Sequence, residues 1–227
     1  MEGRYGFLRL EPKESEDAGW IYAFGVYYPR HQAIRHHHSD WSRAVILAKR
    51  GAAEVIDRFG GLIAGRIQQR ILKSEDYVIT HVPADPGPVQ YLFGEYGRGA
   101  PDLLAESIHR NLGPRRNVTL APLLVTVRAK GRKQHQCSSP TERKANVKGL
   151  YAVSDPSVIP GRIIILVDDV LTTGATMREC ARLLWAEGAR HVTGVVLART
   201  VHGTEMDTGG MPEIRDERMP EYAMVAG

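Results

Sequence analysis

One stretch of the chain, IIILVDDVLTTGATMREC at residues 163–180, limits the possible folds more than any other. It opens with a short apolar run rich in isoleucine, which is typical of a fully buried strand. Two aspartates follow, then a turn rich in threonine and glycine, and then a segment with helical spacing. A buried strand that runs directly into a helix is half of a strand–helix–strand unit, so a parallel sheet is expected.

The rest of the sequence repeats this alternation of strand and helix patterns. We predict strands over 19–28, 76–81, 123–128, 149–153, 162–167 and 191–198, and helices from a Ser42 cap to Lys49, over 55–71, from Pro101 onward, and over 176–187 before a stop at Gly188. The expected fold class is α/β, with a parallel sheet flanked by helices. Residues 41–200 form the expected main domain, 1–40 an amino-terminal hood or appendage, and 201–227 a tail or lid.

The composition favours a soluble protein that binds anions. Hydrophobic residues make up 43% and charged residues 25% of the chain, as in globular proteins, and no apolar run is long enough to span a bilayer. The amino terminus has no secretory or transit pattern, so a cytoplasmic location is expected. Cys137 and Cys180 lie in unrelated contexts, which argues against a disulfide framework or a zinc site. A net charge of +4 does not choose between nucleic acid and a phosphorylated small molecule.

The segment after the predicted strand 162–167 has the chemistry of a sugar phosphate site. In a parallel sheet, ligands bind beyond the carboxyl ends of the strands, where Asp168 and Asp169 are expected. Carboxylates accept hydrogen bonds from hydroxyls or hold a hard divalent cation. Hydroxyls and free backbone N–H groups at the start of a helix form a phosphate pocket. The residues that supply these groups are Thr172, Thr173, Gly174 and Thr176.

Other interpretations of this segment explain fewer of its features. An isolated Asp-Asp pair is most often a solvated turn, but the complete run of strand, acidic pair and threonine loop argues against it. The glycine-lysine pattern of the P-loop and the Gly-x-Gly-x-x-Gly dinucleotide pattern are both absent from this segment. A signalling receiver domain carries its acidic pair after its first strand, whereas here several elements precede the pair.

The run VDDVLTTGAT (167–176) resembles the phosphoribosyl pyrophosphate (PRPP) motif of type I phosphoribosyltransferases. The resemblance implies that Asp168 and Asp169 bind the ribose 2- and 3-hydroxyls and hold Mg²⁺, directly or through the ligand. It also implies a loop that wraps the 5-phosphate, so the full set of PRPP-binding positions beyond the acidic pair is Val170, Leu171, Thr172, Thr173, Gly174, Ala175 and Thr176.

Three further segments, 98–108, 134–153 and 184–200, resemble the competence-associated, ComF-like branch of these enzymes, so the similarity covers most of residues 41–200. Two features depart from the branch. The amino-terminal module with four cysteines is absent from this sequence, and RGAPD (98–102) departs from the usual RGFNQ segment.

The resemblance implies a Mg²⁺-dependent transfer of the phosphoribosyl group from PRPP to a nucleobase or related nitrogen nucleophile, with release of pyrophosphate. The cationic segment 128–144 resembles the mobile catalytic loop of the fold, in which Arg132 and Lys133 are the predicted catalytic cations. The turn 82–87 lies where the family places its pyrophosphate loop, with Asp85 and Gly87 as predicted contacts, although an ordinary Pro-Gly turn explains the same residues. The acceptor is unknown.

A second class of function stays open, namely a non-catalytic PRPP- or nucleotide-binding regulator, or a DNA-handling accessory protein. Basic residues without interleaved aromatics give only weak support for single-strand binding. A homodimer is expected from the resemblance alone. The run His36–His38 is interpreted as an exposed loop, because adjacent side chains do not converge on one metal ion. Trp41 and Trp185 are interpreted as core residues, with a base-stacking role as the alternative.

Overall fold

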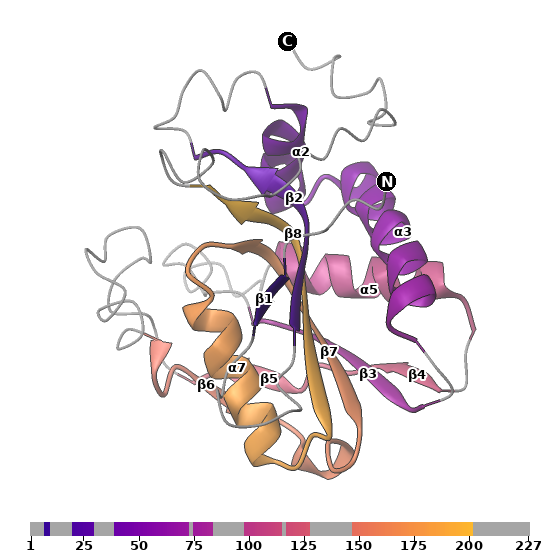
Figure 1. The fold of residues 1–227 in the computed structure, drawn as a ribbon, viewed down its shortest axis with the longest axis vertical. Coiled ribbons are helices and arrows are strands. Elements are labelled where there is room, and N and C mark those ends of the chain that lie inside the picture. Colours follow the sequence, from indigo (N-terminus) through magenta and orange to yellow (C-terminus); the bar gives the residue numbers. More distant parts are fainter. Residues whose placement is uncertain are drawn as a thin grey trace.

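The central feature is a mixed but mostly parallel sheet (Figure 1). The structure, a computed structural model, describes residues 7–9, 20–29, 39–72, 75–83, 98–114, 117–127 and 147–201. Within these residues the sheet has the order β1-β2-β8-β7-β3-β4, and only the β1–β2 pair is antiparallel. Its strands are β1 (Phe7–Arg9), β2 (Trp20–Tyr27), β3 (Tyr77–His81), β4 (Val118–Leu120), β7 (Ile163–Leu171) and β8 (His191–Thr200). The predicted α/β fold class is confirmed.

Helices cover both faces of the sheet, as Figure 1 shows with α3 and α5 on one side and α7 on the other. The helices of the described chain are α2 (Asp40–Lys49), α3 (Ala53–Arg70), α5 (Ala100–Leu112) and α7 (Ala175–Ala186), with the short 3₁₀ helix η2 (Pro156–Val158). One buried cluster lies between the sheet and α2, α3 and α5, and a second lies beneath α7. Among these helices none is long and apolar enough to cross a membrane.

β7 occupies the centre of this arrangement because its side chains are apolar on both faces. The side chains of residues 164–167 are completely buried, with the odd-numbered ones in the first cluster and the even-numbered ones in the second. This is the pattern expected for a parallel strand with helices on both sides. The predicted strand and the helix that follows it are therefore confirmed as a βα unit.

The strand predicted over 123–128 is not part of the main sheet. Residues Leu124–Thr126 form β5, which pairs in antiparallel fashion with β6 (Tyr151–Val153) in a separate two-stranded ribbon. The apolar character of the segment is misleading, because Val125 and Val127 are 41% and 58% exposed. The edge strand of the main sheet is instead β4, which is only three residues long and gave no recognisable pattern.

Two details of the helices also differ from prediction. Ser39, not Ser42, caps α2: its hydroxyl accepts a hydrogen bond from the Ser42 amide at 3.1 Å. Ser42 is fully buried inside the helix, where its hydroxyl binds other groups. In α3 the predicted apolar face is largely buried, but Leu62 is 38% exposed and lies at its margin.

The strands β1 and β2 lie in the segment 1–40 that was predicted as a hood or appendage. β2 pairs in parallel with β8 over Ile21–Tyr27, and β1 extends the sheet beyond β2. These strands therefore widen the central sheet of the protein by adding to it at the side of β8.

Both tryptophans named in the sequence are packing residues, as interpreted. The Trp41 ring lies 5.1 Å from the Phe59 ring, centroid to centroid, and its indole nitrogen is buried. It packs directly on the backbone of Gly25 in β2, where a Cβ atom would lie only 1.7 Å from the indole nitrogen. Trp185 packs against the second cluster. The close approach at Gly25 holds α2 against the end of β2.

We expect Gly25→Ala to destabilise the protein by at least about 1–3 kcal/mol, because the added methyl overlaps the indole of Trp41. Gly65→Ala is the matched control, since Gly65 is an exposed residue of α3 with no atom within 4 Å of the added Cβ. It should raise the free energy of unfolding by about 0.5–1 kcal/mol through helix propensity. Urea unfolding of both variants measures the difference, and equal effects would contradict the packing described for Trp41.

Candidate functional site

The acidic pair, Asp168 and Asp169, lies in the part of β7 that extends beyond the end of β3 but still pairs with β8. β7 pairs with β3 only as far as Val167, which is opposite His81, but with β8 as far as Leu171, which is opposite Arg199. The predicted strand end at 167 is thus correct on the β3 side and four residues short on the β8 side. Asp168 and Asp169 are held in extended backbone at an open edge of the sheet, and both are half-buried.

Hydrogen bonds within the strand orient the two carboxylates. Oδ1 of Asp168 accepts from the amide of Asp169 at 2.8 Å, and Oδ1 of Asp169 accepts from the amide of Val170 at 2.5 Å. The other oxygen of Asp169 lies 3.3 Å from Nζ of Lys49, at the end of α2. Both oxygens of Asp169 are therefore engaged by groups of the protein itself.

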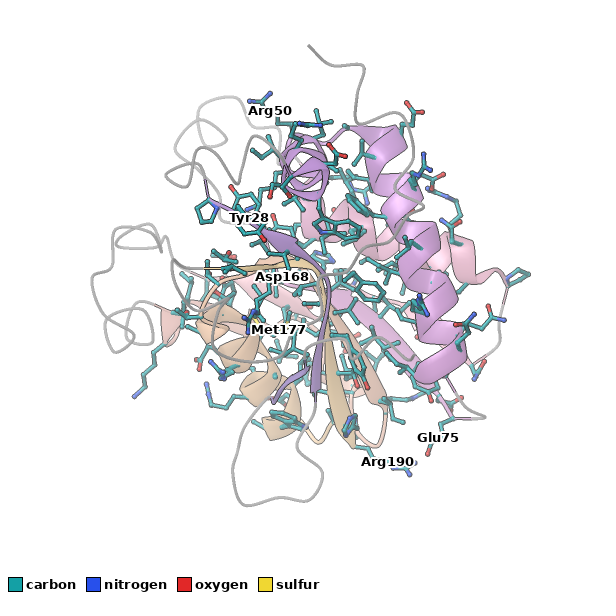
Figure 2. The ribbon with its side chains drawn as sticks, turned by 45° about the horizontal axis from the view of Figure 1, so that its top comes forward. Tyr28, Arg50, Glu75, Asp168, Met177 and Arg190 are labelled. Atoms are coloured by element: carbon teal, nitrogen blue, oxygen red, sulfur yellow. The ribbon has the colours of Figure 1, made fainter. Side chains whose placement is uncertain are left out.

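Lys49 is a site residue that the sequence patterns did not reveal. Burial alone would lower the pKa of its ammonium group, but the negative charges of Asp169 and then Asp168 outweigh burial and raise that pKa above its usual value. Its place is fixed by the start of α2, since the buried Ser42 hydroxyl accepts a hydrogen bond from the Tyr28 amide at 3.0 Å. Figure 2 shows Tyr28 and Asp168 toward the same end of the molecule, opposite Glu75 and Arg190.

The predicted phosphate loop joins β7 to α7 through a left-handed glycine. Gly174 has φ +74° and occupies the N-cap of α7, so no side chain of its own caps the first-turn amides. Thr172 is exposed, and Thr173, Ala175 and Thr176 are half-buried around it. Within the described chain, the hydroxyls of Thr172, Thr173 and Thr176 have no hydrogen-bond partner. This turn offers donors at the positive end of a helix.

Arg178 adds a positive charge beside this loop. Its Nη1 donates to the carbonyl oxygen of Thr173 at 2.7 Å, and the guanidinium lies against Gly174, 3.1 Å from where a Cβ would stand. The bond braces the loop between β7 and α7 and leaves further N–H groups of the guanidinium available.

A second polar cluster lies at the end of β3, beside the acidic pair. Nδ1 of His81 is 3.9 Å from Oδ1 of Asp102 in α5, and the guanidinium of Arg98 binds both oxygens of Asp102. Arg98 also pairs with Glu106. Burial lowers the pKa of His81, an effect that Arg98 adds to and that the carboxylate of Asp102 only partly opposes. The hydrogen bond from Arg98 lowers the pKa of Asp102.

The carboxylates fit Mg²⁺ only in combination with ligand oxygens. In the described part of the chain there is no group of three or more His, Cys, Asp or Glu side chains that could hold a metal ion. Asp168 and Asp169 supply two carboxylates, which suits Mg²⁺ because that ion commonly takes its other oxygens from a phosphorylated substrate and water. A metal held by the protein alone has no support from these residues.

Four predicted site residues lie outside the described residues, namely Asp85, Gly87, Arg132 and Lys133. The run His36–His38, which is interpreted as an exposed loop, also lies outside them. The points where segment 128–146 leaves and rejoins the described chain are nevertheless fixed. The amide of Val127 donates to the carbonyl oxygen of Leu150 at 2.9 Å, and the Gly149 amide donates to Glu179 of α7 at 3.3 Å. The cationic segment thus starts and ends on a ribbon that is docked on α7.

A model of the phosphoribosyl transferase domain matches residues 103–217, more than half of the chain. The matched region contains the acidic pair, the threonine loop and α7. The chain therefore belongs to the phosphoribosyl transferase domain family, and the family predicted from the motif is confirmed.

Among curated relatives, the chain is similar to the DNA utilization protein YhgH of Escherichia coli, with 42% identity over 59 residues. That match covers 26% of this chain and spans 25% of the relative. Among solved structures, a hypoxanthine phosphoribosyltransferase from Staphylococcus aureus aligns with a TM-score of 0.41 and 8% identity, over 66% of this chain and 75% of that one. A hypothetical protein from Neisseria gonorrhoeae with bound ppGpp aligns with a TM-score of 0.41 and 18% identity, over 70% and 74% of the two chains.

The lowered pKa of His81 leads to a prediction about stability. As pH falls from 7.5 to 5.5, through the ordinary histidine pKa of about 6.5, the unfolded chain takes up a proton that folded His81 resists. The free energy of unfolding should therefore fall with pH, and His81→Asn should reduce that fall. Urea titrations of the wild type and of His81→Asn at pH 7.5 and 5.5 measure the effect. Between pH 7.5 and 8.5 the free energies of unfolding of the two proteins should change in parallel. An equal fall in both proteins between pH 7.5 and 5.5 would assign the effect to other groups.

Proposed function

We propose that this protein transfers the phosphoribosyl group of PRPP to a nucleobase or related nitrogen nucleophile and releases pyrophosphate. The observation that carries the proposal is the single βα turn that joins two half-buried carboxylates to a glycine-capped helix start. A ribose 5-phosphate unit has hydroxyls and a phosphate to match these two groups of partners. Membership of the phosphoribosyl transferase family supports the same ligand class.

In this proposal, Asp168 and Asp169 accept hydrogen bonds from the ribose hydroxyls. Val170 and Leu171 carry the chain from the acidic pair to the loop Thr172–Thr176, whose amides and hydroxyls take the 5-phosphate. The guanidinium of Arg178 holds this loop through the Thr173 carbonyl and favours an anion beside it. Binding at both ends fixes the ribose ring and so orients its C1 atom.

During transfer the bond between C1 and the pyrophosphate oxygen breaks, and a bond from C1 to the acceptor nitrogen forms. Positive charge develops on the ribose ring and negative charge on the departing pyrophosphate. The carboxylates of the acidic pair favour the first charge, and cations of segment 128–144, with Arg132 and Lys133 as candidates, favour the second. When bound, Mg²⁺ would neutralise pyrophosphate charge and orient the leaving group. Asp85 and Gly87 stay candidates for the pyrophosphate loop.

A second candidate is a binding protein without catalysis, either a nucleotide sensor or a DNA-handling accessory. The similarity of 59 residues to a protein named for DNA utilization favours this alternative. A DNA-binding role would give affinity for single-stranded DNA that falls steeply with salt and does not respond to PRPP.

The proposed donor site predicts that PRPP binds in the presence of Mg²⁺ and that Asp168→Asn/Asp169→Asn weakens binding by about tenfold or more, because hydrogen bonds to charged groups contribute roughly 1.5–3 kcal/mol each. Calorimetric titration measures both affinities. A screen of nucleobases for pyrophosphate release then tests catalysis.

Asp76→Asn is the matched control, because it removes an aspartate that pairs with Arg162 just before β3, at the opposite end of the strands. It should leave PRPP binding unchanged. Binding of PRPP without pyrophosphate release from any base would support the sensor. Failure of the wild-type protein to bind PRPP, together with salt-dependent DNA binding, would replace the donor-site proposal by the accessory role.

A further inference from the structure

The proposed transfer does not require a cation at the position of Lys49. It belongs to α2, which is outside the matched family region 103–217, yet its ammonium group lies 3.3 Å from Oδ2 of Asp169. The other oxygen of Asp169 accepts from the Val170 amide. Side-chain exposure is 43% for Lys49 and 18% for Asp169, so the contact is accessible to a ligand from the solvent side.

The position of Lys49 is built into the fold. Ser39 and the buried Ser42 tie the first turn of α2 to the end of β2 through the Tyr28 amide. Trp41 packs on Gly25 in the same turn of the helix. The helix then crosses toward β7 and ends at Lys49, so the ammonium group is delivered to the acidic pair by packed elements.

A fixed ammonium changes what the acidic pair can bind. Two carboxylates alone attract a divalent cation, but a positive charge already placed on Asp169 repels one at close range. An anionic ligand that arrives with the metal removes this repulsion, because its own negative charge pairs with the ammonium. The pair should therefore bind metal and anion together far better than metal alone.

We propose that Lys49 is a specificity-determining residue of the donor site. Its ammonium group pairs with the carboxylate of Asp169 and so restricts the acidic pair to divalent cations that arrive with an anionic ligand. This inference rests on the proposed PRPP site for the identity of that ligand. The effect on bare metal is independent of it, because it depends only on the contact between Lys49 and Asp169.

Titration with Mn²⁺ alone, followed by the electron paramagnetic resonance signal of the free ion, tests the proposal. We expect weak binding by the wild-type protein and an affinity higher by about tenfold or more for Lys49→Met, since the repelling charge is gone. Lys49→Arg should keep the wild-type behaviour because it restores the charge. Lys49→Gln is the second neutral variant, and thermal melting confirms that each variant is folded.

Arg50→Met is the matched control. It removes the same charge from the adjacent residue, and Figure 2 shows Arg50 on the far side of α2 from Asp168. Its affinity for Mn²⁺ should equal that of the wild type. The gain in Lys49→Met should disappear in Lys49→Met/Asp169→Asn, which assigns the effect to this carboxylate.

Three outcomes would overturn the proposal: equal Mn²⁺ affinity in Lys49→Met and Arg50→Met, no gain in either neutral Lys49 variant, or a gain that persists without Asp169. A parallel titration of PRPP with Mg²⁺ into the wild-type protein separates the two proposals. Absence of PRPP binding there, with a Mn²⁺ gain in Lys49→Met, would refute the PRPP site and leave the control of metal entry by Lys49 intact.

Discussion

The unequal reach of the two strands beside β7 is the constraint on which the site depends. β8 pairs with β7 as far as Leu171, whereas β3 pairs with β7 only as far as Val167. The backbone that carries the acidic pair is therefore held on one side and open on the other. A pair of carboxylates on a free loop would lose conformational entropy when a ligand orders it, and here much of that cost is met when the sheet folds. The length of β8, which is itself paired with β2, thus contributes directly to the site.

The open edge places negative charge between two cations that come from different layers. Lys49 approaches from α2, and Arg178 stands on α7 at the loop beyond the pair. The negative charges of Asp169 and Asp168 in turn raise the pKa of the Lys49 ammonium group above its usual value. The same ammonium limits which ligands gain from the pair. One side chain thus contacts the acidic pair in the unliganded protein and, in our proposal, sets which ligands the pair selects.

The sequence predicts the centre of this protein better than its margins. The run 163–180 is decisive because its strand is apolar on both faces and its loop chemistry is local, so no distant partner is needed to interpret it. The segment 123–128 misled because an apolar run does not say which strand it pairs with, and Val125 and Val127 are exposed in a separate ribbon. Both Ser39 and Ser42 are of a residue type that caps helices, and only the hydrogen bonds of the folded chain show that Ser39 is the cap and that Ser42 lies inside the helix. The role of Lys49 could not be predicted from the sequence either, because its partner Asp169 lies 120 positions away in the chain.

The ribbon of β5 and β6 has a consequence for how this protein can change. Its strands clamp the two ends of segment 128–146 together through the Val127 to Leu150 hydrogen bond, and Glu179 fastens the ribbon to α7. The entropy cost of closing a flexible segment grows slowly, by about 0.6 kcal/mol for each doubling of its length. The ribbon can therefore accommodate a change in the number of residues between its two strands at a small cost in closure entropy, while β5, β6 and α7 keep their packing.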